Sequence, residues 1–297
     1  MSLQEKLEAV LSESSATFGV VVKHLETQEE AQINANEYFQ MASTFKVPIL
    51  ATLFRDVSEG RLSLEQRIRL TEDDLVPGSG VLQEFLPGAE VAIKDLAMLM
   101  IIVSDNLGTD KVLELVGKER VEAFMKEQGL SHISIRNSCW ELLSIGGGLA
   151  GEKKGLEGFQ KLKQKFQTTG IDADSVIFQP IPENNVATPA DMGKLLELIA
   201  TGQLVSQEAC DGVLDIMKRQ QLRNRIPYLL PDKTIIACKS GTIGSVVNDV
   251  GIVYLPEGKG AFTIAAFSHG NHSTKEGERM IARLTLTAYE HFAHSEE

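Results

Sequence analysis

The chain lacks several features that would assign it to common classes of protein. The longest apolar run, Leu96 to Val103, is far shorter than the roughly 20 residues that a membrane-spanning helix needs. The first dozen residues have neither a basic region nor an apolar one, so they do not form a signal peptide. Three cysteines without a CxxC pair argue against a disulfide framework and against a structural zinc site.

An excess of positive charge is also missing. The 297 residues contain 29 Lys and Arg against 41 Asp and Glu, which gives a net charge of −12. This charge repels a phosphate backbone, so we expect no nucleic-acid partner. We expect a monomer that acts on a small molecule, with no membrane partner. As written the chain is expected in the cytoplasm, or outside it or in the periplasm if a leader has been removed.

The order of apolar patterns predicts an α/β fold. Strand-like runs occur near both ends, at 18–25, 31–35 and in three stretches after 233, whereas the middle is mostly helical. Because two strands alone are not a stable sheet, the strands of both termini should form one antiparallel sheet flanked by helices. Residues 1–58 and 215–297 would form this sheet lobe and 59–214 an inserted helical lobe. A ligand cleft is expected between the lobes.

Within these patterns, helices are predicted at 3–14, after 46, at 93–103, 110–127, 189–201 and 274–292. Thr188 and Pro189 have the chemistry of a helix start. A Gly-rich turn and a basic amphipathic helix should follow residue 145.

Three short motifs carry the chemistry. Ser43 and Lys46 lie three residues apart at a predicted helix start, which places hydroxyl and amine on one face. Ser104, Asp105 and Asn106 follow a buried apolar helix, and Lys239, Ser240, Gly241 and Thr242 end a strand-like run. Each motif alone is more often a helix start, a helix end or an edge strand. In this order, however, they match a known set: Ser-x-x-Lys, Ser-Asp-Asn and Lys-Thr-Gly, with Ser in place of that Thr.

The chain resembles class A serine β-lactamases and, more widely, the penicillin-recognising serine enzymes. The resemblance lies in these three motifs, in PGSGVLQ (77–83) and in the helix start at Thr188. The resemblance runs along nearly the whole chain. It implies that Ser43 is the nucleophile, that Lys46 assists its deprotonation and that Ser104 relays a proton to the leaving nitrogen. It also implies that Asn106 holds the substrate amide. Neither a metal nor an organic cofactor is implied.

The same resemblance implies that the substrate is bound by Lys239, Ser240, Gly241 and Thr242. Lys239 would bind the carboxylate of the substrate. The backbone N–H groups of Ser43 and Thr242 would form the oxyanion hole, in which each donor contributes about 3 kcal/mol. None of the six histidines is needed as a base, and the His269–His272 pair has no accompanying carboxylate or cysteine in metal-site spacing.

Family hydrolases also use a glutamate that activates water, on a loop across from the nucleophile and usually after a tryptophan. Trp140-Glu141 makes Glu141 the candidate, and Glu183 is an alternative. The family pattern continues with Pro and, four residues after the Glu, Asn, whereas this chain has Leu142 and Ile145. Because of this difference, the alternative that Glu141 is an ordinary helix-start or loop glutamate stays open.

A second departure follows the third motif, where family lactamases often carry an arginine that faces the substrate carboxylate. The chain has Asn248 and Asp249 there, which resembles a divergent class-A-like branch. Arg223 and Arg225 are both candidates to replace the charge. The predicted function is therefore hydrolysis of a β-lactam amide through an acyl-enzyme on Ser43. The alternatives are a related serine esterase or peptidase, or a penicillin-binding protein with weak or no β-lactam turnover.

Overall fold

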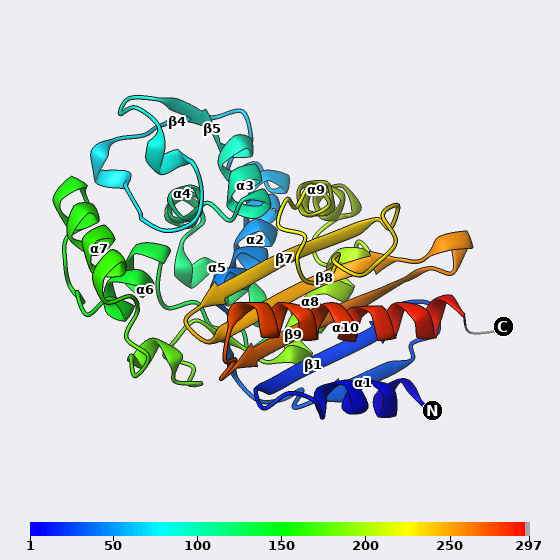
Figure 1. Ribbon diagram of the computed structural model, residues 1–297. Coiled ribbons are helices and arrows are strands. Elements are labelled where there is room, and N and C mark those ends of the chain that lie inside the picture. The colour runs from blue at the N-terminus through cyan, green and yellow to red at the C-terminus, as the bar shows by residue number, and fades with distance from the viewer. Residues whose placement is uncertain (295–297) are drawn as a thin grey trace.

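A computed structural model describes residues 1–294 and contains a five-stranded antiparallel sheet in the order β2-β1-β9-β8-β7 (Figure 1). The two N-terminal strands pair with the C-terminal ones through β1 and β9, where Thr17 opposes His269 and His24 opposes Phe262. The predicted α/β fold with a sheet built from both termini is confirmed. The strands are β1 (Thr17–His24), β2 (Glu30–Ile33), β7 (Ile236–Ile243), β8 (Val246–Tyr254) and β9 (Ala261–His269).

Two terminal helices cover one face of this sheet, α1 (Leu3–Leu11) and α10 (Thr274–Ala293) (Figure 1). Leu3 and Leu7 pack with Ile281 and Leu284 over Val20, and all five side chains are buried. Full burial of one such aliphatic side chain stabilises the fold by about 1.5–3 kcal/mol. The first helix begins at a capping box formed by Ser2 and Glu5.

The other face of the sheet and the helical region share one continuous hydrophobic core, which includes Ala265 of β9, Leu50 of α2 and Leu195 of α8. Helix α8 belongs by sequence to the predicted helical lobe, 59–214, yet it packs on β1 and β9. The helices are α2 (Lys46–Ser58), α3 (Ile93–Ile102), α4 (Asn106–Val116), α5 (Lys118–Glu127), α6 (Cys139–Gly146), α7 (Leu156–Thr168), α8 (Pro189–Ala200) and α9 (Gln207–Met217).

Short elements that the sequence did not reveal complete the fold. Two small antiparallel pairs are β3 (Phe39–Gln40) with β6 (Val186–Ala187), and β4 (Arg67–Arg69) with β5 (Glu90–Ala92). The 3-10 turns are η1 (Ala42–Phe45), η2 (Glu72–Asp74), η3 (Leu82–Glu84), η4 (Val176–Phe178) and η5 (Pro256–Gly258).

The single helix predicted over 110–127 is wrong. The segment belongs to α4 and α5, which meet at Gly117. Gly117 has a φ of 79°, a left-handed conformation that ends a helix and that glycine adopts without strain. Within residues 1–294, no helix has both the length and the apolar character needed to cross a bilayer.

Candidate active site

The segment that carries Ser43 enters α2 through the tight turn η1. Ala42, the residue before Ser43, has a φ of 45°, which is strained for a residue with a Cβ. Strand β7 passes so close that a Cβ at Gly241 would lie 2.8 Å from the Ser43 amide nitrogen. Glycine is therefore required at 241, where the strand approaches the Ser43 backbone. Ser43, Gly241 and Thr242 all line one cleft of about 430 Å³.

Lys46, one turn after Ser43, is fully buried and turns its amine toward the Ser-Asn segment of the second motif. Its Nζ lies 2.8 Å from the backbone oxygen of Ser104, 3.0 Å from the Ser104 Oγ and 2.9 Å from Asn106 Oδ1. Burial lowers the pKa of Lys46, although Cys139, Asp105 and Asp110 oppose that shift. A lysine with a lowered pKa can act as a proton acceptor near neutral pH.

Ser104 lies between two buried lysines. Lys239 Nζ is 3.1 Å from the Ser104 Oγ and also donates to the Ser240 backbone oxygen at 2.6 Å. Burial lowers the pKa of Lys239 well below its usual value, and the nearby charge of Lys46 acts in the same direction. Two ammonium groups on one hydroxyl repel each other, so this arrangement favours loss of a proton from one of them.

The loop that presents Ser104 is held in a strained conformation. Ser104 has a φ of 58°. The carboxylate of Asp105 accepts hydrogen bonds from the backbone N–H groups of Val81 (2.6 Å), Leu82 (2.8 Å) and Gly108 (2.9 Å). It therefore caps α4 and fixes the 77–83 loop. Because a Cβ at Gly80 would lie 2.3 Å from the Asp105 side chain, that loop position requires glycine.

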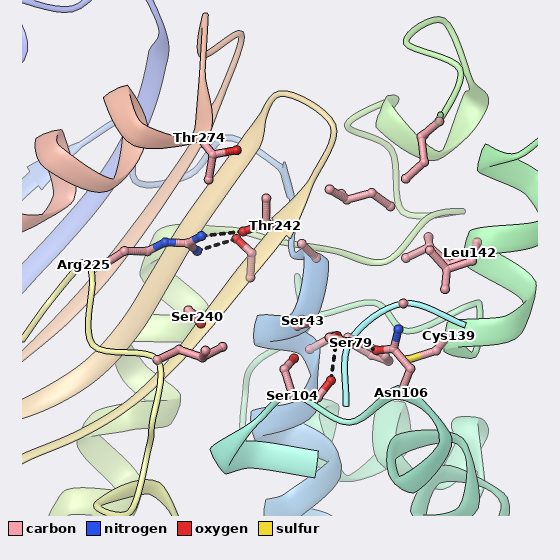
Figure 2. A pocket seen from close by; sticks show the side chains of 18 of the residues that line it. Ser43, Ser79, Ser104, Asn106, Cys139, Leu142, Arg225, Ser240, Thr242 and Thr274 are labelled. Carbon is pink, nitrogen blue, oxygen red and sulfur yellow. Dashed lines mark hydrogen bonds between the residues drawn. The ribbon is translucent and has the colours of Figure 1, made fainter. Parts of the chain in front are cut away.

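Strand β7 and its neighbours make one wall of the cleft, as Figure 2 shows for Ser240, Thr242 and Arg225. Arg225 Nη1 donates to the backbone oxygens of Gly241 (2.8 Å) and Asn248 (2.6 Å), and its Nη2 donates to Thr242 Oγ1 at 2.5 Å. Of the two arginines that the sequence left open, Arg225 is buried at the cleft. Arg223 is exposed and does not line it.

Asn248 and Asp249 support this wall from β8. The Asn248 amide donates to the backbone oxygens of Gln40 (2.8 Å) and Met41 (3.0 Å), directly before the Ser43 turn. Asp249 accepts the Ile226 backbone N–H at 3.1 Å, and burial raises its pKa to about 6 although Arg225 opposes that shift. These two residues thus hold the Ser43 turn and the Arg225 segment against the sheet.

Helix α6 and residue 171 make the opposite wall, which is mainly apolar. Cys139, Leu142, Leu143 and Ile171 line it, and Figure 2 shows Cys139 and Leu142 across the cleft from Thr242. The start of α6 is fixed by buried Asp110, whose carboxylate accepts the N–H groups of Cys139 (2.6 Å) and Trp140 (3.0 Å). Burial raises the pKa of Cys139 to about 12, so its thiol is neutral.

Glu141 lies outside the cleft that the other predicted site residues line or contact. Its carboxylate lies 2.8 Å from Lys118 Nζ and accepts the Ser138 N–H at 2.7 Å in the capping box of α6. Burial raises its pKa, but the hydrogen bonds from Lys118 and Ser138 together with the charge of Lys118 outweigh this, and the net shift of the pKa is downward. Its side chain is 46% exposed and does not line the cleft. The structural interpretation of this glutamate therefore fits its position, and the role of water-activating base does not.

The alternative, Glu183, is exposed and also does not line the cleft. Among the cleft-lining residues in the described part of the chain, Glu278 on α10 is the one carboxylate, and it lies 3.4 Å from Arg225 Nη2. Sequence reasoning missed both Cys139 and Glu278, because neither belongs to a motif. Across residues 1–294 no cluster of three or more His, Cys, Asp or Glu side chains could hold a metal ion.

The structure thus brings together every predicted site residue except Glu141. Ser43, Ser104, Asn106, Ser240, Gly241 and Thr242 line the cleft, and Lys46 and Lys239 contact Ser104 from beneath it. The chain also matches the family described as "Beta-lactamase enzyme family" over residues 2–292.

The chain belongs to this β-lactamase family. It is 28% identical over 305 residues to β-lactamase VEB-1 of Pseudomonas aeruginosa, covering 98% of this chain and 90% of that protein. The β-lactamase structure from Sphaerobacter thermophilus DSM 20745 superposes with a TM-score of 0.80 at 26% identity, covering 97% of this chain and 96% of the other. A PBP-A mutant in an acyl-enzyme complex with penicillin G superposes with a TM-score of 0.78 at 27% identity, covering 98% and 96%. The chain is a serine hydrolase of the β-lactamase type, as its motifs predicted.

Proposed function

We propose that the cleft transfers the acyl group of a β-lactam to Ser43 and that hydrolysis of the resulting acyl-enzyme is the slower half of the reaction. The observation that carries the proposal is the placement of Ser104 between the amines of Lys46 and Lys239, next to the cleft that Ser43 lines. A nucleophile, a base and a proton donor for the leaving nitrogen are what acyl transfer from an amide needs.

In the acylation step the Ser43 Oγ attacks the β-lactam carbonyl carbon, and its proton passes to the Lys46 amine. The carbonyl–nitrogen bond breaks, and the ring nitrogen takes a proton through the Ser104 hydroxyl. No fragment leaves, because the ring nitrogen stays attached to the opened antibiotic. The N–H groups of Ser43 and Thr242 would stabilise the oxyanion, Asn106 would hold the side-chain amide, and Lys239 would attract a substrate carboxylate.

A second candidate function, long-lived binding of penicillin, is favoured by the α6 wall. Cys139, Leu142 and Leu143 lie there, and the carboxylate that lines the cleft, Glu278, pairs with Arg225 on the other side. Without a carboxylate facing the ester from α6, water must be activated by a weaker arrangement. The structurally similar PBP-A mutant, solved as an acyl-enzyme complex with penicillin G, supports this alternative.

The test is β-lactam ring opening, followed with nitrocefin. We expect Ser43→Ala to abolish enzyme-dependent opening and Ser63→Ala, a serine outside the cleft, to behave as the wild type. Ring opening by Ser43→Ala at the wild-type rate would contradict the assignment of the nucleophile. Opening of about one equivalent in a fast phase, followed by a slow phase, would identify hydrolysis as the slower step.

Two further expectations remain proposals. The sheet lobe of 1–58 and 215–297 and the helical lobe of 59–214 would act as one catalytic unit, with the continuous core joining them. The protein would act as a monomer on a small substrate.

A further inference from the structure

Glu278 places a negative charge at the end of the cleft where a substrate carboxylate is expected to bind. It lies in the second turn of α10, lines the cleft, and its side chain is 17% exposed. Its Oε1 accepts hydrogen bonds from Arg225 Nη2, at 3.4 Å, and from the Asn224 side-chain amide. The carboxylate is therefore held in place beside the arginine.

Arg225 has little hydrogen-bonding capacity left for a ligand. Both of its Nη1 bonds go to backbone oxygens, at 2.8 and 2.6 Å, and one Nη2 bond goes to Thr242. Its Nε is buried and without a partner. A guanidinium has five N–H groups, so the N–H that points to Glu278 is the remaining one on the two Nη atoms. The 3.4 Å contact is also the longest of the set, and so the easiest to exchange.

We propose that Glu278 determines specificity by occupying the arginine donor that an anionic substrate would otherwise use. A substrate carboxylate at this end must displace Glu278 from Arg225 and remain close to its like charge. A neutral acyl compound meets no such opposition. The cleft therefore disfavours substrates with a carboxylate at the Arg225 end relative to neutral ones of the same shape. This inference rests on the proposed acylation of Ser43.

Benzylpenicillin and its methyl ester are a matched pair that differs in this one charge. Acylation efficiency would be measured for both compounds with the wild type, Glu278→Gln and Glu290→Gln. Gln keeps the acceptor oxygen and removes the charge, and Glu290 is an exposed residue of the same helix away from the cleft. We expect Glu278→Gln to raise the efficiency for benzylpenicillin about 3- to 10-fold and to leave the methyl ester within about twofold. Glu290→Gln should change neither compound.

A parallel rise or fall for both compounds would overturn the proposal, because Glu278 would then act through the structure of the cleft. A selective fall for benzylpenicillin would also overturn it and would show that Glu278 orients Arg225 for the substrate. Dissociation constants measured in the Ser43→Ala background keep the test independent of acylation. There Glu278→Gln should tighten binding of benzylpenicillin alone. Failure of the wild type to be acylated by either compound would contradict the proposed function, whereas unchanged binding ratios in Ser43→Ala would contradict the role of Glu278.

Discussion

The two walls of the cleft differ in chemistry and in how they are held. The β7 wall is polar. Arg225 donates to the Gly241 backbone oxygen within this wall, and Asn248 donates to the Gln40 backbone oxygen just before the Ser43 turn. The α6 wall presents Cys139 and two leucines, and its anchor is Asp110 behind the helix start. The β7 side therefore has groups that bind a substrate and stabilise charge. Among the described residues, those of α6 that line the cleft include no carboxylate.

This difference separates the two halves of an acyl-transfer cycle. Acylation depends on Ser43, Lys46 and Ser104. Of these, Ser104 contacts both Lys46 and Lys239 of β7. Deacylation depends on a base that faces the ester, and the one carboxylate among the described cleft-lining residues, Glu278, pairs with Arg225 on the β7 side. The cleft thus has the groups for the first half of the cycle, and under the proposed function the second half is the slower one.

The largest expected effect comes from giving the α6 wall a base. Cys139→Glu places a carboxylate at the cleft-facing start of α6, and general base catalysis should raise the deacylation rate by about 10²-fold. The measurement is the decay of the acyl-enzyme by intact mass. Cys139→Gln is the control with the same size and no base. Equal acceleration in both variants would show that space for water, rather than a base, limits deacylation.

The second effect concerns the proton acceptor between the walls. Lys46 must be neutral to accept the Ser43 proton, and burial lowers its pKa below the usual lysine value of 10.5. The acylation rate should therefore rise with pH, by up to about tenfold per unit below that pKa, and level off before pH 10.5. Stopped-flow acylation by benzylpenicillin between pH 5 and 10 measures this. A rate independent of pH over that range would show that Lys46 is not the base.

The smallest expected effect is at Glu141. Glu141→Gln should change acylation and deacylation by less than about twofold, since the side chain pairs with Lys118 outside the cleft. It should lower the free energy of unfolding by at most about 1 kcal/mol, because a half-exposed ion pair is weak and glutamine preserves the capping box. Urea unfolding and nitrocefin kinetics check both parts. An acyl-enzyme that persists only in the variant would restore Glu141 as the base.

The sequence predicted the β7 side of the site better than the α6 side for a physical reason. Ser43, Ser104 and Lys239 lie in short motifs whose spacing is fixed by a helix turn, a loop and a strand. The α6 wall depends on how a helix start is rotated. Ser138 caps α6, so Glu141 turns back to the capping box and Lys118 while Cys139 and Leu142 face the cleft. The Ser138-x-x-Glu141 spacing is a capping-box pattern that indicates this position for Glu141. That Cys139, two residues earlier, lines the cleft has no such local signal.

The fold was similarly predictable where long patterns repeat. The strands after 233 and the helix over 274–292 follow clear periodicities. The break at Gly117, the pairing of β3 with β6 and the packing of α8 on the sheet depend on contacts between distant segments. Arg225 was one of two candidates, and its burial beside Gly241 and Asn248 decided between them.

The most direct test of the account is the lifetime of the acyl-enzyme. The wild type would be mixed with benzylpenicillin, freed of excess drug, and followed by intact mass with peptide mapping. We expect a mass increase equal to one whole antibiotic on the peptide that carries Ser43, with decay slower than formation. Consumption of many equivalents of drug with no adduct trapped at any time, or an adduct on another residue, would contradict it.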